Sequence, residues 1–295
     1  MRTTERLPQW LKPKQSKLGA ARHLSALLDS DIPNSICQEA KCPNRSDCYA
    51  KGVLTFMILG TICTRACAFC AVAHGKPLPP DPNEAQTLIQ SIQKLKLKFV
   101  VLTSPNRDDL KDNGSGHFAM VVRSIKEALP AVKVEILIPD FKGKFDDLET
   151  AIQSKPDVAN HNLETVPSLY KTIRKGSLYP RSLLVLKNMK VINPAILTKT
   201  GLMLGLGETL DELKFVFDDI VAQGVDILTL GQYPKPDKQG ADVIRYYPPD
   251  EFDQLRDIAL SAGIRHVFAG PLVRSSFLAE SVFDTFLESQ SPCAS

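Results

Sequence analysis

Residues 53–70 read VLTFMILGTICTRACAFC, an apolar run followed at once by three closely spaced cysteines. The run at 53–59 has the length and composition of a buried strand. Further strands are predicted at 99–103, 132–138, 157–160, 197–204 and 225–230, and helices at 83–95, 117–129, 145–153, 166–175 and 208–223. Strands that alternate with helices indicate a parallel sheet covered by helices. These six units favour an α/β fold of the partial (β/α)6 TIM-like barrel type, although a doubly wound sheet also fits.

Polar residues follow the predicted strands in chain order. They lie at 104–109, 139–140, 161–164, 205–208 and 232–233. Barrel enzymes carry their sites at the carboxyl ends of the strands. The pattern therefore predicts one barrel mouth lined with polar groups.

The composition limits the class of protein. With 295 residues, 43% of them hydrophobic, the chain can form one large α/β unit. Its net charge of +3 is spread along the chain, which indicates neither a nucleic-acid partner nor a membrane partner. We find no signal peptide and no apolar run of about 18 residues, so we expect a cytoplasmic protein. In a reducing compartment, clustered cysteines more often bind metal or act in catalysis than form disulfides.

Cys63, Cys67 and Cys70 form a C-x3-C-x2-C triplet in the loop after the first predicted strand. Three thiolates can hold three irons of a [4Fe–4S] cluster and leave the fourth iron open. An open iron suits a catalytic cluster better than an electron carrier. The spacing differs from the cysteine run of bacterial ferredoxins and from the paired C-x2-C of zinc sites, although structural zinc is the alternative. The aromatic Phe69 directly before the last cysteine supports the catalytic interpretation.

A second triplet, Cys37, Cys42 and Cys48, has the spacing C-x4-C-x5-C. Spacing alone suits zinc as well as an iron–sulfur cluster. The seventh cysteine, Cys293, lies close to the end of the sequence and is expected to be a spare thiol.

From about residue 5 to residue 283, the sequence resembles the lipoyl synthases of the radical S-adenosylmethionine superfamily. The segments that carry the resemblance are ICQEAKCPNRSDC, TFMILGTICTRACAFC, NRDDL, HNLETVP, GLMLGLGET, LTLGQY and GPLVRSSF, in the family order. The resemblance implies an enzyme that inserts sulfur at C6 and C8 of a protein-bound octanoyl group. It also implies two [4Fe–4S] clusters and S-adenosylmethionine as cofactors.

The resemblance assigns a cluster to each triplet. It implies that Cys63, Cys67 and Cys70 hold the cluster whose open iron is chelated by S-adenosylmethionine. Cys37, Cys42 and Cys48 then hold an auxiliary cluster, the sulfur donor, whose fourth ligand is a serine of the RSSF segment at 274–277. We favour Ser276 over Ser275 as that ligand, although the sequence does not decide between them. The ordinary interpretation of such a pair is a helix cap.

Further expectations concern the contacts of S-adenosylmethionine and the substrate channel. The candidates for cofactor binding are Phe69, Ser104, Asn162, Glu164, Arg174, Gly205 and Gly207, and Arg174 and Arg181 are candidates for the channel. The alternative for the glycines is an ordinary turn, and the alternative for the serine, asparagine, glutamate and arginines is a solvated loop or helix position.

The resemblance also implies partners. These are octanoylated lipoyl carrier domains (the E2 subunits of 2-oxoacid dehydrogenases and the glycine cleavage H protein), a ferredoxin- or flavodoxin-type reductant, and an iron–sulfur carrier protein. We expect an N-terminal extension at 1–52, a radical S-adenosylmethionine barrel at 53–270 and a C-terminal extension at 271–295, the two extensions covering the barrel mouth. The alternatives are a methylthiotransferase, a two-cluster electron carrier or a zinc-bound scaffold.

Overall fold

A seven-stranded parallel sheet forms the frame of the structure, a computed structural model that describes residues 7–11 and 54–276. Its strands pair in chain order: β1 (Thr55–Met57), β4 (Phe99–Thr103), β5 (Lys133–Leu137), β6 (Val158–Asn160), β7 (Leu197–Leu204), β8 (Ile227–Gln232) and β9 (His266–Gly270). Every neighbouring pair is parallel. Strands β1 and β9 stand at the two edges, so the barrel is partial.

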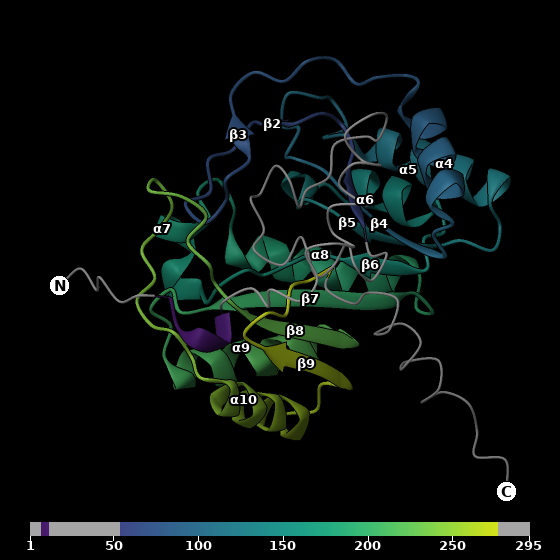
Figure 1. The fold of residues 1–295 in the computed structure, drawn as a ribbon. Coiled ribbons are helices and arrows are strands. Elements are labelled where there is room, and N and C mark those ends of the chain that lie inside the picture. The colour runs from purple at the N-terminus through teal and green to yellow at the C-terminus, as the bar shows by residue number, and fades with distance from the viewer. Residues whose placement is uncertain (1–6, 12–53, 277–295) are drawn as a thin grey trace, which may run out of the picture.

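Helices connect successive strands and cover the outer face of the sheet (Figure 1). They are α4 (Glu84–Leu95), α5 (Ser115–Ala128), α6 (Phe145–Ile152), α7 (Tyr170–Ile173), α8 (Tyr179–Ile192), α9 (Leu210–Ala222) and α10 (Pro249–Ser261). Three 3-10 helices, η1 (Gln9–Leu11), η3 (Phe141–Gly143) and η4 (Pro167–Leu169), and a two-stranded parallel sheet of β2 (Ile62–Cys63) and β3 (Ala73–His74), complete the described elements. Figure 1 shows β2 and β3 set apart from the main sheet.

The predicted fold class is confirmed, since the sheet is parallel, helix-covered and ordered along the chain as in a partial barrel. A doubly wound sheet would reverse its strand order, and this one does not. All six predicted strands are present, but the count is one short because β9 was not predicted. The predicted helix at 166–175 is instead η4 followed by the short α7, which ends where Arg174 leaves the helical conformation.

The described helices are short, and the longest of them, α5 and α8, have 14 residues each. Nowhere in the described part of the chain is a helix both long and apolar enough to cross a membrane.

Alternating side chains give the sheet two apolar layers. Val100 and Leu102 of β4 point outward into the large core shared with the helices. Phe99 and Val101 of the same strand belong to a separate, smaller cluster with residues of β6, β7 and β8. This alternation is the period of a strand, and it identifies the smaller cluster as the barrel interior.

Two glycines allow neighbouring segments to pack closely at the barrel mouth. Gly201 of β7 and Gly231 of β8 both line a cavity at the carboxyl end of the sheet. A Cβ on Gly231 would lie 1.9 Å from the carbonyl oxygen of Val273. The C-terminal segment at 271–276 therefore runs directly against β8, at a distance that only glycine allows.

Candidate functional site

A cavity of about 960 Å³ lies at the carboxyl ends of the strands. Its wall combines the cysteine loop, the loops after β4, β5, β6 and β8, the segment at 272–276, and Leu7 and Leu11 near the N-terminus. The predicted site residues that line it are Cys63, Cys67, Cys70, Phe69, Ser104, Asn162, Glu164, Arg174, Ser275 and Ser276. The structure thus brings together residues that span more than 200 positions of the sequence.

The three thiols of the loop differ in exposure: Cys63 is buried, Cys67 half-buried and Cys70 exposed. The Cys63 sulfur accepts hydrogen bonds from the backbone N–H groups of Arg65 (3.4 Å) and Asn106 (3.3 Å). Burial raises the pKa of the Cys67 thiol to about 11. As a bare thiol, Cys67 is therefore protonated at neutral pH, and a bound metal would displace the proton.

Hydrogen bonds attach the cysteine loop to three other segments of the chain. The N–H and the hydroxyl of Thr64 both donate to the carbonyl of Asn106, at 3.0 and 2.9 Å. Ala68 donates to the carbonyl of Ile173 (2.8 Å) and accepts from the N–H of Ala241 (2.7 Å). The loop is therefore attached to segments that follow β4, β6 and β8.

Two polar atoms on the cavity wall lack a partner. Within the described residues, the Ser104 hydroxyl and the side-chain carbonyl of Asn162 are buried without a hydrogen bond. Buried polar groups are almost always paired, so such atoms at a cavity indicate a polar ligand. The side-chain N–H₂ of Asn162 is occupied, donating to Glu164 (3.1 Å) and to Ser275 (3.2 Å).

Glu164 and Arg174 both lie on the same wall. Withdrawal from water raises the pKa of Glu164, against the attraction of Arg174. Arg174 is buried, with 8% of its surface exposed, and donates to Tyr170 (2.8 Å) and Ser182 (2.9 Å). A zwitterionic ligand with an ammonium and a carboxylate would find a partner for each in this pair.

His161 stands behind this wall, fully buried, and was not selected from the sequence although its segment was. Its Nδ1 lies 2.9 Å from the carbonyl of Ile138, so Nδ1 carries the proton. Its Nε2 lies 3.0 Å from the Ser182 hydroxyl. Burial, followed by the charge of Arg174, lowers the pKa of His161 to about 3.

Three other predicted residues lie elsewhere. Neither Gly205 nor Gly207 is among the residues that line the cavity. A Cβ on Gly205 would lie 2.2 Å from the side-chain nitrogen of Gln232, so this glycine (φ +98°) serves close packing within the chain. Arg181 approaches Asp140 at 3.3 Å, away from the cavity wall.

The donor set suits a cluster better than a single ion. In the parts of the chain that the structure describes, no three His, Cys, Asp or Glu side chains converge to hold one metal ion. A [4Fe–4S] cluster places each thiolate on a different iron, so its ligands need not converge on one point. Cys37, Cys42, Cys48 and Cys293 lie outside the described residues.

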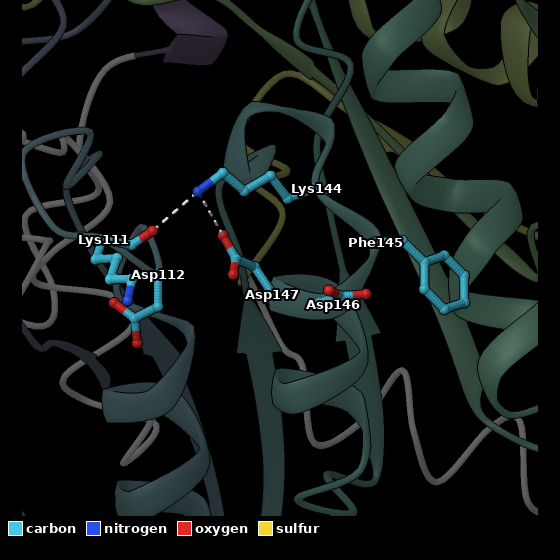
Figure 2. A pocket seen from close by; sticks show the side chains of 6 residues that line it. All are labelled: Lys111, Asp112, Lys144, Phe145, Asp146 and Asp147. Atoms are coloured by element: carbon cyan, nitrogen blue, oxygen red, sulfur yellow. Dashed lines mark hydrogen bonds and ion pairs between the residues drawn. The ribbon is translucent and has the colours of Figure 1, made fainter.

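A second, shallower pocket lies on the surface beside α6, and its lining contains none of the predicted residues. Figure 2 shows the Lys144 ammonium bonded to the carbonyl of Lys111 (2.9 Å) and near the carboxylate of Asp147 (3.9 Å). Asp112 accepts from the N–H groups of Gly114 and Gly116 at the start of α5. These groups stabilise local structure, so the functional site is the large cavity.

Comparison with known proteins agrees with this geometry. Residues 57–220, more than half of the chain, match the family model described as "Radical SAM superfamily". A lipoyl synthase of Haemophilus influenzae is 51% identical over 282 residues, covering 92% of this chain and 86% of the relative. A lipoyl synthase of Thiobacillus denitrificans is 48% identical, covering 94% and 89%. The fold is similar to that of Streptococcus suis SuiB (TM-score 0.57, 13% identity, 83% of this chain and 55% of SuiB). The chain therefore belongs to the lipoyl synthase family, within the radical S-adenosylmethionine superfamily.

Proposed function

We propose that this chain inserts sulfur at C6 and C8 of an octanoyl group carried by a lipoyl domain. The enzymes of its family use S-adenosylmethionine and [4Fe–4S] clusters. The observation that supports the proposal for this chain is a single cavity that is lined both by the cysteine loop and by Ser275 and Ser276. The methylthiotransferase, electron-carrier and zinc-scaffold alternatives gain no support from the relatives described above.

The first cluster belongs, in this proposal, to Cys63, Cys67 and Cys70, with S-adenosylmethionine on its open iron. When S-adenosylmethionine is bound and the cluster is reduced, they would supply a radical reactive enough to remove a hydrogen atom from a saturated carbon. Glu164 and Arg174 fit the ammonium and carboxylate of S-adenosylmethionine by charge. The unpartnered oxygens of Ser104 and Asn162 fit its remaining polar groups.

The second cluster belongs to Cys37, Cys42, Cys48 and one serine. The hydroxyl of Ser275 already accepts a hydrogen bond from Asn162 at 3.2 Å, which favours Ser276 as the iron ligand. Oxygen is a harder ligand than thiolate and binds iron less firmly in a sulfur-rich site. A labile ligand suits a cluster that gives up sulfur. The extensions at 1–52 and 271–295 would then meet at the barrel mouth.

The substrate needs an apolar path that excludes water, because a carbon radical reacts with whatever it meets. Apolar side chains on the cavity wall meet this need: Leu7, Leu11, Leu137, Ile138, Leu202 and Met203. Family membership implies octanoylated lipoyl domains as substrates. We further propose the E2 and H-protein carriers, a ferredoxin- or flavodoxin-type reductant, an iron–sulfur carrier partner, and a cytoplasmic location.

Replacing each triplet by alanine tests the assignment. The variant at Cys37, Cys42 and Cys48 should keep S-adenosylmethionine cleavage but lose sulfur insertion. The variant at Cys63, Cys67 and Cys70 should lose both, and Cys293→Ala, as the matched control, should lose neither. If the folded variant at Cys37, Cys42 and Cys48 no longer cleaves S-adenosylmethionine, the assignment of separate roles to the two clusters is contradicted.

A further inference from the structure

Arg65 lies inside the cysteine loop, two residues after Cys63 and two before Cys67. Only 8% of its surface is exposed. Its Nε and Nη2 donate to the Asp108 carboxylate at 2.7 and 2.9 Å. Its Nη1 and Nη2 donate to the Asp140 carboxylate at 2.9 and 2.7 Å. One guanidinium thus makes a two-point contact with each of two carboxylates.

The two carboxylates belong to different parts of the barrel. Asp108 follows β4 and Asp140 follows β5, so Arg65 joins the loop to two neighbouring strand ends. Although burial alone would raise the pKa of Asp140, Arg65 holds it well below its ordinary value. Charge-assisted, two-point contacts of this kind fix direction as well as distance. They also need the planar fork of arginine, which lysine lacks.

The turn before α8 closes over the arginine. Nη1 of Arg65 also donates to the Ser177 hydroxyl at 3.1 Å. Gly176, with φ +85°, lies so close that a Cβ there would be 3.2 Å from the Arg65 Cδ. The stem is therefore packed against Gly176, and all three nitrogens of the guanidinium donate hydrogen bonds to Asp108, Asp140 or Ser177.

We propose that Arg65 is a positioning residue: its contacts with Asp108 and Asp140 fix the cysteine loop in the geometry that holds the first cluster. This inference rests on the proposed assignment of that cluster to Cys63, Cys67 and Cys70. Groups that orient metal ligands from outside typically contribute about 10–100-fold in metal affinity. Arg65 reaches the cluster only through the loop, so its effect is on cluster retention and geometry.

The test is Arg65→Lys in the full chain carrying both clusters. The measurement, made on protein reduced with dithionite, is the rate at which the EPR signal that responds to S-adenosylmethionine disappears in the presence of an iron chelator. We expect this rate to rise about 10–100-fold, with a changed line shape of the signal. Asp108→Asn weakens one of the two carboxylate contacts and should give a smaller rise in the rate of signal loss. It replaces Arg65→Lys as the test if that variant does not fold.

Lys199→Met is the control. Lys199 is also buried, with 1% exposed, and its ammonium lies 3.1 Å from the Glu135 carboxylate, but neither residue lines the cavity or contacts the cysteine loop. This variant should lower the melting temperature without changing the rate of signal loss. Equal rates in wild type, Arg65→Lys and Asp108→Asn would overturn the inference, as would an equal acceleration by Lys199→Met. A wild type without any responsive signal would overturn the cluster assignment itself.

Discussion

The side-chain amide of Asn162 donates a hydrogen bond to the hydroxyl of Ser275 across 3.2 Å, although the two residues are 113 positions apart. Asn162 follows β6 at the barrel mouth, and Ser275 lies on the C-terminal segment. The contact therefore sets where that segment crosses the cavity. Under the proposed assignment, Ser275 is the hydrogen-bond acceptor and Ser276 is the candidate iron ligand.

Ser276→Cys should keep the auxiliary cluster but reduce lipoyl product roughly tenfold or more, because thiolate releases iron less readily than oxygen. Ser275→Ala should keep most product and lose about 1 kcal/mol of stability with its hydrogen bond. Mass spectrometry of the product and iron analysis measure the two effects. Product loss in Ser275→Ala but not in Ser276→Ala would reverse the assignment, and full product in both of these alanine variants would exclude serine ligation.

Gly231→Ala should displace the C-terminal segment, because the new Cβ would lie 1.9 Å from the carbonyl oxygen of Val273. A displacement of about 1 Å at a reacting site can reduce the rate about 100-fold. Gly270→Ala is the matched control: it is paired with Gly231 on the next strand and meets only a side-chain methyl of Val273, at 3.3 Å. We expect a much smaller loss of product in the control. Equal losses would show that the strands themselves are disturbed.

His161 should make stability depend on pH. Its pKa of about 3 in the folded state lies below the value of about 6.5 in the unfolded chain. The unfolded chain binds the proton between these values, so this contribution is fully present above about pH 6.5 and is lost as the pH falls toward the folded-state value. From pH 7 to pH 5 the loss is about 2 kcal/mol. The melting temperature of wild type should therefore fall by several degrees more than that of His161→Gln, whereas parallel falls would contradict the burial of a neutral imidazole.

Lys199→Met should destabilise the protein by about 3–5 kcal/mol, because it leaves the Glu135 carboxylate buried without its counter-charge. Both side chains are 1% exposed, and the ammonium lies 3.1 Å from the carboxylate inside the barrel. Adding Glu135→Gln should recover much of the loss, since the amide oxygen can still accept from Asn160, which donates to Glu135 at 3.0 Å. Denaturant unfolding measures the free energy of unfolding of the single and the double variant. If the double variant is no more stable than the single one, the buried charge is not the cause.

Apolar runs predicted much of the frame because strands such as β4 and β8 are largely apolar and buried on both faces. This pattern missed β9 because only Val267 in that strand is buried, so the strand is not a continuous run of core residues. It missed α8 because exposed Leu184 and Val191 spread apolar residues around the helix. In both cases tertiary packing, rather than local pattern, determines the element.

The cysteine spacing predicted which loop forms the site, since C-x3-C-x2-C is local in sequence. The Arg65 contacts with Asp108 and Asp140 are long-range, spanning 43 and 75 positions, and no local spacing encodes them. The available signal was an arginine inside the cysteine loop together with aspartates after two successive strands. The glycines at 205 and 207 looked like a ligand loop, yet Gly205 serves contacts with Gln232 and Arg245 of the same chain.

The most direct test of the central claim is an anaerobic reaction of the full chain with an octanoylated lipoyl-domain peptide, S-adenosylmethionine and a reductant. Mass spectrometry follows the peptide, and chromatography follows 5′-deoxyadenosine. The account predicts a lipoyl product with sulfur at C6 and C8, formed without added sulfide and limited to the sulfur that the enzyme's own auxiliary cluster supplies. An unchanged peptide, from protein that carries both clusters and still cleaves S-adenosylmethionine, would contradict it.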